Sequence, residues 1–439
     1  MLARRQALAE RARALAQGMP GPSTAEPSSR AASVSFRAPR VSRPKVRRRD
    51  TPRILPLRPA VKRRLAPLII DPAAAESVRR SGLTEAELRS VKAPTLRAYG
   101  ECDGRFHAWC RTHRQLGKWV NALLAFVTFL MSSGAATSEV EKTVSAVMFF
   151  KSASLRQYPR VVRALRGQRH VRPHRSRVPL AEEVVSAVAA ILVSWGLRPL
   201  ALLVLTAMTA YLRPGEVMSL RAEDILPPSQ GSAALLREWS VFLRPEERGE
   251  PTKTGTFDET IYLDHPPGLG PALGAYKNQY RPSMTLFPFQ PSLVATVWRA
   301  AVEAAGAPGS VLYQLRHAGA SGDLLALRRS MLVIQSRGRW KSSTNCRRYS
   351  KSGQVQRSLA KLSPGQMALG IASLKNLEGL LLGSWSPPSR LVPPPPRRVV
   401  RCQQAMNECI MKARSIGGAG RKRRPPEASC TRGSKRARR

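Results

Sequence analysis

Acidic residues are scarce in this chain. Its 439 residues include 28 Asp and Glu but 73 Lys and Arg, which gives a formal net charge of +45. This imbalance argues against an ordinary metabolic enzyme, because such a charge attracts polyanions and gains affinity from the counterions that neutralised phosphates release. The composition therefore predicts a nucleic acid as the partner, and an anionic membrane surface is the weaker alternative.

Cysteines are also few. The six cysteines are irregularly spaced and do not suggest a disulfide framework, so a reducing compartment is expected. Two cysteines and two histidines lie close together in the sequence: Cys102, His107, Cys110 and His113. Because they fall within one expected helix, they cannot converge tetrahedrally on a zinc ion, and a plain helix face is predicted instead.

Long apolar runs and the common cofactor motifs are missing as well. The most apolar stretch, residues 184–212, is divided by Arg198-Pro199 into pieces that suit buried helices and are too short to cross a bilayer. The sequence has no P-loop, no Gly-x-Gly-x-x-Gly after a strand, no His-Glu-x-x-His and no obvious pair of metal-binding carboxylates. We therefore expect no membrane association, no cofactor and no metal, and metal-dependent nuclease chemistry is disfavoured.

Composition also indicates how the chain is organised. Residues 1–82 are rich in Pro, Ser, Ala and Arg without apolar periodicity, which predicts a disordered basic arm. Apolar residues then recur at helical spacing over residues 83–168, which predicts a small helical domain. Thr84 followed by Glu87 is the pattern of a helix start with a capping box.

A second domain is predicted after a polar, basic linker at residues 169–177. Residues 178–365 contain helical patterns around a hairpin or short sheet at 238–264, where aromatic and β-branched residues flank a Gly- and Pro-rich centre. Residues 366–439 are predicted to form a Pro-rich and basic tail. The predicted fold class is thus mainly α with a small β-sheet: a helical domain, an α+β domain and basic disordered tails.

A spaced set of basic and aromatic residues stands out in the second domain. In chain order they are Arg213, Lys253, Arg316, His317, Trp340 and Tyr349. Each alone has a structural explanation, as a solvated arginine, a turn lysine or a core aromatic. Together they suit the cleavage of a phosphodiester, whose transition state is highly anionic.

Each residue type has a role in such a reaction. Two arginines can hold the non-bridging oxygens, a lysine can protonate the departing 5′ oxygen, and a tyrosine can attack and form a phosphotyrosyl ester. Because the reference pKa of tyrosine is about 10, the attacking group needs positive charge or a base nearby at neutral pH.

With their neighbours, these residues resemble the motifs of the tyrosine recombinase (phage integrase) family. Arg213, with Glu216 three residues later, resembles the first arginine box, in which the acid steadies the arginine. Thr252-Lys253-Thr254-Gly255 resembles the family's catalytic lysine turn.

The second half of the resemblance lies further along the chain. Leu315-Arg316-His317-Ala318 resembles the second arginine box, and Trp340 with Tyr349 nine residues later matches the His/Trp position and the nucleophile. Trp in place of His looks closest to recombinases of eukaryotic mobile elements, the DIRS-like and Crypton-like kinds.

The resemblance implies a site, an assembly and a partner. It implies catalytic roles for Tyr349, Arg213, Lys253, Arg316, Trp340 and Tyr313, and supporting roles for Glu216 and His317. Residues 83–168 would be a core-binding (SAM-like) domain that closes on double-stranded DNA together with the catalytic domain. Four protomers would assemble on two sites and exchange strands without ATP or metal.

Two departures from the family pattern leave alternatives open. Tyr313 stands where the family usually has His, three residues before Arg316, and Arg339 stands where it usually has Gly. The alternatives are a catalytically inactive, domesticated DNA-binding relative, a type IB topoisomerase-like activity that relaxes DNA, and a basic protein that packages nucleic acid.

The end of the chain bears on localisation. Basic clusters at residues 421–424 and 435–439 have the composition of a bipartite nuclear localisation signal, which predicts a nuclear protein. A solvated tail that binds nucleic acid has the same composition. The Arg-rich start of the chain makes organelle targeting a weaker alternative.

Overall fold

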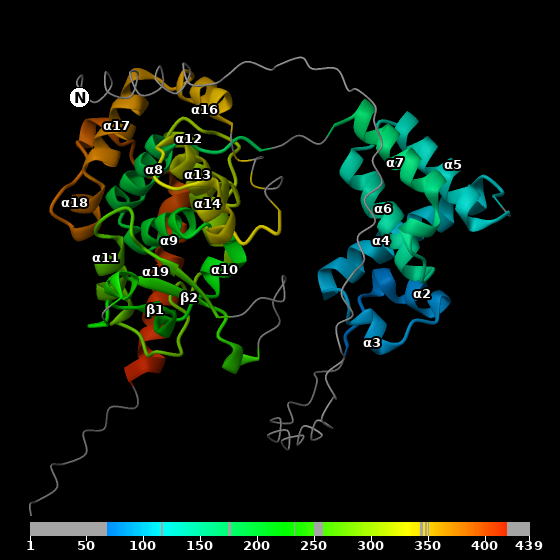
Figure 1. The fold of residues 1–439 in the computed structure, drawn as a ribbon, viewed down its shortest axis with the longest axis horizontal. Coiled ribbons are helices and arrows are strands. Elements are labelled where there is room, and N and C mark those ends of the chain that lie inside the picture. The colour runs from blue at the N-terminus through cyan, green and yellow to red at the C-terminus, as the bar shows by residue number, and fades with distance from the viewer. Residues whose placement is uncertain are drawn as a thin grey trace, which may run out of the picture.

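The computed structural model describes residues 68–115, 117–173, 177–231, 233–249, 258–342, 346, 349 and 351–418. These residues form mostly helices and one small antiparallel sheet, which confirms the predicted fold class (Figure 1). Lys253, residues 1–67 and the basic clusters at 421–424 and 435–439 lie outside the described residues, so the expectations about them stay predictions. Of the helices described, none has the length and apolarity needed to cross a bilayer.

The first group of helices covers residues 72–171 and so extends beyond the predicted helical domain, 83–168, at both ends. Its elements are α2 (Pro72–Ser81), α3 (Glu85–Leu88), α4 (Ala93–Thr112), α5 (Trp119–Ser132), α6 (Thr137–Phe150), the 3₁₀ turn η1 (Leu155–Gln157) and α7 (Pro159–Val171). Thr84 and Glu87 form the expected capping box at the start of α3. The prediction of disorder over residues 1–82 is wrong for its last residues, because α2 occupies residues 72–81. Asp71 caps this helix and Pro72 is its first residue, and both residue types favour a helix start.

The core of this group lies between α4, α5, α6 and α7. Phe106, Leu123, Phe126 and Val144 are among its buried side chains. Of the residues considered for zinc, Cys102, His107 and Cys110 lie along the single helix α4, and His113 is the C-cap of that helix.

The second group of helices gathers in a separate part of the molecule (Figure 1) and encloses a larger hydrophobic core. Its helices are α8 (Glu182–Ser194), α9 (Arg198–Thr209), α10 (Pro214–Met218), α11 (Leu269–Lys277), α12 (Pro291–Ala304), α13 (Gln314–Leu325), α14 (Met331–Arg337), α16 (Ser352–Leu359), α17 (Pro364–Lys375), α18 (Leu377–Leu382) and α19 (Arg397–Gly418). Most side chains of α8 and α9 are buried, because neighbouring helices cover them on several sides. The two pieces of the apolar stretch 184–212 are therefore buried core helices, as predicted.

The sheet lies beside these helices. Its strands β1 (Ile225–Leu226), β2 (Ser240–Leu243) and β3 (Glu259–Tyr262) are antiparallel and follow the order β1-β2-β3. Val241 pairs with Ile261, and both side chains are buried in the core. The strands predicted within 238–264 are thus present, and the connection between β2 and β3 is the part of the chain that contains Lys253.

The prediction that residues 366–439 form a tail is wrong for most of the residues described in that range. α17 and α18 belong to the helical core, and the 22-residue helix α19 packs along it. Five side chains bury one face of α19: Val399, Cys402, Met406, Ile410 and Ala413. They recur every three or four residues, so the helical signal was present in a stretch whose proline and arginine content suggested disorder. The indole N–H of Trp195 fixes the preceding Pro-rich segment by donating to the Pro393 carbonyl (2.8 Å).

Candidate active site

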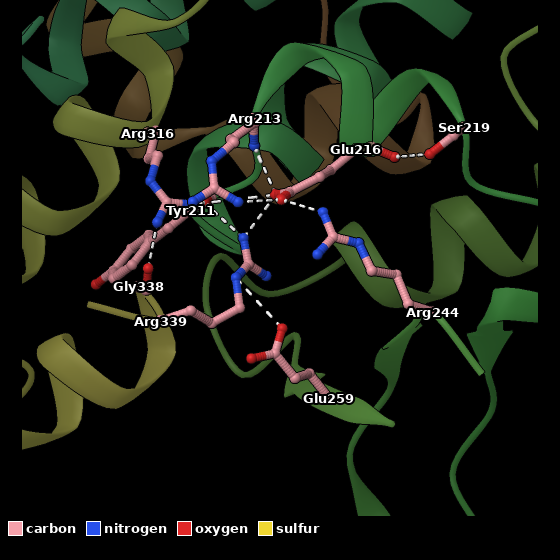
Figure 2. A network of polar contacts seen from close by, with 9 residues as sticks. All are labelled: Tyr211, Arg213, Glu216, Ser219, Arg244, Glu259, Arg316, Gly338 and Arg339. Carbon is pink, nitrogen blue, oxygen red and sulfur yellow. Dashed lines mark hydrogen bonds and ion pairs between the residues drawn. The ribbon is translucent and has the colours of Figure 1, made fainter. Parts of the chain in front are cut away.

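Glu216 lies at the centre of a polar network at the start of α10 (Figure 2). Because α10 begins directly after Arg213, Glu216 reaches back over one turn and accepts from the Arg213 backbone N–H (2.9 Å) and its Nη1 (2.5 Å). Burial alone would raise the pKa of Glu216, but the charges of Arg339 and Arg213 and the backbone hydrogen bond lower it. The structure therefore brings Arg213 and Glu216 together as predicted, with Glu216 as a carboxylate.

Arg316 is the most deeply buried of the candidate arginines, with 1% of its surface exposed. It lies on α13, which approaches α9 closely at Gly319, where a Cβ would lie 2.0 Å from the Met208 carbonyl oxygen. Its Nη1 donates to the Tyr211 carbonyl (2.6 Å), and its Nη2 donates to the Gly338 carbonyl. The guanidinium is thereby held rigidly between the α9–α10 corner and the segment after α14.

Two further arginines reach Glu216, and neither was selected from the sequence as a site residue. Arg244, directly after β2, donates to Oε1 of Glu216 (2.7 Å), and Arg339, after α14, donates to Oε2 (2.6 Å) (Figure 2). Arg339 was noted only as a departure from the family pattern, although its position beside Trp340 was a usable signal. Arg244 has no distinguishing signal among 73 Lys and Arg.

The network carries an excess of buried positive charge. Four guanidinium groups surround the Glu216 carboxylate. Those of Arg213, Arg244 and Arg339 are hydrogen-bonded to it, and the fourth is that of Arg316, whose Nη1 lies 4.0 Å away. Burial lowers the pKa of Arg339 to about 10 and also lowers that of Arg316. Within the described ranges, Arg244 Nη1, Arg316 Nε and Arg339 Nη1 are buried without a hydrogen-bond acceptor. Unpaired donors and uncompensated positive charge at one place are the conditions that favour a bound anion.

Tyr349 lies in a small buried cluster next to this network. Its ring centroid is 4.3 Å from that of Trp340 and 4.6 Å from that of His317, and 8% of the residue is exposed. Ser321 on α13 fixes the backbone by donating to the Tyr349 carbonyl (2.5 Å). Burial raises the pKa of the Tyr349 hydroxyl, while the positive charge of Arg316 acts in the opposite direction.

Trp340 connects the arginines to Tyr349. The Arg316 guanidinium lies over its ring at 5.0 Å from the centroid, while Tyr349 packs on the same indole. A cation above an aromatic face is attracted to it, so this contact helps to fix both groups. Arg213, Arg316, Trp340 and Tyr349, which are widely separated in the sequence, are therefore gathered at one place.

His317 and Tyr313 form the border of the cluster. Their ring centroids are 5.4 Å apart, and the Arg177 guanidinium lies 5.7 Å from the Tyr313 ring centroid. Burial, with the charges of Lys351, Arg316 and Arg177, lowers the pKa of His317 to about 4. His317 is therefore neutral at pH 7, and Tyr313 presents a ring and a hydroxyl where the family pattern has an imidazole.

A Gly338→Ala substitution is expected to displace Trp340. A Cβ at Gly338 would lie 2.0 Å from the Trp340 ring, so the indole must move or the backbone must shift. Overpacking of this kind costs about 1–3 kcal/mol of unfolding free energy, measurable by urea denaturation. Gly353→Ala is the matched control, because a Cβ there meets nothing within 4 Å. Equal stability of the two variants would contradict this packing.

No protein-family model and no curated protein matches the chain. Among solved structures it is similar to the XerH site-specific recombinase bound to palindromic difH substrate, a post-cleavage complex, at 13% identity and a TM-score of 0.45 over 64% of this chain and 85% of that one.

Two further structures give similar values. A pre-cleavage complex of XerH with difH substrate matches at 12% identity and a TM-score of 0.42, over 67% of this chain and 92% of that one. The XerA recombinase matches at 15% identity and a TM-score of 0.31, over 66% of this chain and 98% of that one.

Proposed function

We propose that this protein is a DNA strand transferase, a site-specific recombinase or integrase that cuts and rejoins duplex DNA through a covalent bond to Tyr349. The observation that carries the proposal is that Tyr349 packs on the indole of Trp340, with 4.3 Å between the ring centroids, and that the Arg316 guanidinium contacts the same indole. A tyrosine nucleophile requires positive charge beside it, and a phosphate requires donors that face inward; this place offers both.

The proposed reaction has two balanced steps. In the first, the Tyr349 oxygen bonds to phosphorus as the bond from phosphorus to the 5′ oxygen breaks; the Tyr349 proton passes to water, and Lys253 gives a proton to the leaving 5′ oxygen. The DNA is then a 3′-phosphotyrosyl ester. In the second, the 5′ hydroxyl oxygen of a partner duplex bonds to phosphorus and gives its proton back to Lys253. The bond from phosphorus to the Tyr349 oxygen breaks, and the tyrosine takes a proton from water. Because the ester conserves the bond energy, rejoining needs no ATP.

Arg213 and Arg316 stabilise the negative charge that develops on the non-bridging oxygens. Arg316 is already fixed by two carbonyl acceptors, so little reorganisation accompanies the reaction. The net charge of +45 supplies affinity that is independent of sequence and falls steeply with salt. Assembly of four protomers on two sites, a role in a mobile element and a nuclear location belong to the same proposal and follow from the motifs and the basic clusters.

Detergent-resistant capture tests the proposal. The protein is mixed with sheared genomic DNA from its source organism, denatured in detergent, and the DNA that stays attached is sequenced. We expect fragments that share one sequence, with the protein attached at a single phosphate. DNA that is bound before denaturation and entirely released after it would refute covalent chemistry. The recovered sequence also supplies a synthetic duplex for rate measurements.

A second candidate function is DNA binding without cleavage, and the observation that favours it is Tyr313. At the position where the family usually has His, a tyrosine offers a hydroxyl that can donate a hydrogen bond but lacks the imidazole ring. If wild-type protein forms no adduct, Tyr313→His becomes the decisive variant, and adducts formed by it alone would establish an inactivated relative.

Under the proposed function, Tyr313→Phe is expected to slow adduct formation about tenfold. It removes one hydrogen bond to a charged phosphate, worth roughly 1.5 kcal/mol. Quenched time courses on the synthetic duplex measure this rate, and filter binding checks that DNA affinity is retained. An unchanged rate would exclude Tyr313 from the site.

A further inference from the structure

Tyr211 lies at the corner between α9 and α10 and has none of its surface exposed. Its backbone is left-handed, with φ of 48°. A bulky residue rarely adopts this conformation, because its side chain then crowds the neighbouring backbone, so other contacts must hold it there. The hydroxyl, the ring and the carbonyl of Tyr211 each make such a contact.

Helix α13 holds Tyr211 at two points. Arg316, near the start of the helix, donates from Nη1 to the Tyr211 carbonyl (2.6 Å) (Figure 2). Asp323, seven residues later and on the same face of the helix, accepts from the Tyr211 hydroxyl. Between them lies Gly319, where a Cβ would be 2.7 Å from the Tyr211 ring, so the ring packs directly on the helix backbone. Tyr211 therefore fixes α13, and Arg316 with it, against the corner that leads into α10.

Asp323 is itself firmly held. It is 4% exposed, its Oδ1 accepts from Arg328 Nε (2.8 Å), and its Oδ2 accepts from Arg329 Nη1. Burial alone would raise the pKa of Asp323, but the hydrogen bond from Tyr211 and the two arginines lower it. The acceptor of the Tyr211 hydroxyl is therefore a charged carboxylate in a fixed position.

The ring of Tyr211 extends this order to Trp340. The two ring centroids are 6.2 Å apart and the ring planes are inclined by 25°. The Arg337 guanidinium also lies over the Tyr211 ring, 5.5 Å from its centroid. Tyr211 thus contacts Arg316 through its carbonyl and Trp340 through its ring, so a displacement of Tyr211 would move both groups.

We propose that Tyr211 and Asp323 form a positioning pair for the reaction. The pair fixes the Arg316 guanidinium, which is to hold the phosphate, and the Trp340 indole, on which Tyr349 packs. This inference rests on the proposed function and deepens it. Neither member of the pair touches the reacting atoms, and both act through the groups that they hold.

Tyr211→Phe removes the hydroxyl and keeps the ring. Adduct formation on the synthetic duplex should slow about tenfold at unchanged DNA affinity, because the groups that bind phosphate remain but are held less precisely. Quenched time courses measure the rate, and filter binding measures the affinity.

Tyr276→Phe is the matched control for this substitution. Tyr276 is also buried, its ring stacks on Phe287 (5.9 Å, 22°), and its hydroxyl pairs with that of Tyr280 (2.7 Å). The control should lose comparable stability, measured by urea denaturation, and no adduct rate. Equal adduct rates for the Tyr211 and Tyr276 variants would overturn the positioning role.

A double-mutant cycle separates positioning from a general loss of structure. In Arg316→Lys protein the guanidinium that Tyr211 holds is already absent, so adding Tyr211→Phe should slow adduct formation by less than about threefold. A general loss of structure would slow both backgrounds alike. The same loss, about tenfold, in both backgrounds would therefore contradict the proposed pair.

A measurement without DNA keeps this inference separate from the proposed function. The protein is produced with 5-fluorotryptophan at its seven tryptophans, and the ¹⁹F resonance that Trp340→Phe removes is that of Trp340. Tyr211→Phe should broaden or divide this resonance, because the indole then exchanges between positions, whereas Tyr276→Phe should leave it unchanged. A single sharp Trp340 resonance in Tyr211→Phe would refute the positioning pair even if wild-type protein forms adducts. Absence of adducts from wild type, with this resonance broadened as expected, would refute the proposed function instead.

Discussion

A Tyr349→Phe variant should form no detergent-resistant DNA adduct while it still binds DNA reversibly. The substitution removes one hydroxyl and keeps a ring that packs between Trp340 and His317, so the local cluster should persist. Loss of the nucleophile in a covalent enzyme costs on the order of 10⁶-fold in rate, well beyond the range of an adduct assay. Gel analysis of the denatured complex measures adducts, and filter binding measures reversible affinity.

Tyr280→Phe is a suitable control for this experiment. Tyr280 is 9% exposed, against 8% for Tyr349, and its hydroxyl pairs with that of Tyr276 (2.7 Å) on another part of the domain. The Tyr280→Phe variant should be about 1 kcal/mol less stable to unfolding, and it should form adducts at the wild-type rate. Adducts formed by Tyr349→Phe at the wild-type rate would refute the assignment of the nucleophile.

An Arg316→Lys variant is expected to form adducts about 10²–10³-fold more slowly than wild type. Lysine keeps the charge but loses the fork that donates to the Tyr211 and Gly338 carbonyls and lies over Trp340. Leaving buried acceptors unpaired costs about 1–3 kcal/mol of unfolding free energy, which is less than the total unfolding free energy of about 5–15 kcal/mol that is usual for a folded domain. The variant should therefore stay folded at 25 °C, and the rate loss should be a property of the site.

Arg398→Lys is the corresponding arginine control. Arg398 is half exposed and pairs with Glu303, so its replacement should change neither adduct rate nor stability measurably. A wild-type rate for Arg316→Lys would mean that the buried guanidinium only supports the fold. Circular dichroism of both variants separates a loss of folding from a loss of rate.

The sequence predicted the parts of the molecule that depend on local pattern. The Thr84 capping box, the division of 184–212 into two buried helices and the strands within 238–264 all follow from residue spacing. The gathering of Arg213, Arg316, Trp340 and Tyr349 was implied by motif resemblance, and no local pattern contains it.

Other features depend on tertiary contacts that composition conceals. The apolar face of α19 is regular, but it is diluted by arginines and preceded by prolines, so composition suggested a tail. Arg244 and Arg339 have meaning only because β2, β3 and the end of α14 converge on Glu216. For Arg339, the departure from glycine in the family pattern gave a hint of a special position, but its partners could be identified only from the fold.

The most direct test of the central claim is to locate the DNA on the protein. The wild-type adduct is digested with nuclease and trypsin and analysed by mass spectrometry; cleavage after Arg348 and Lys351 isolates residues 349–351. The account predicts that this peptide carries a nucleotide linked through its 3′ phosphate to the Tyr349 oxygen. An adduct on any other residue, or none from protein that binds DNA, would contradict it.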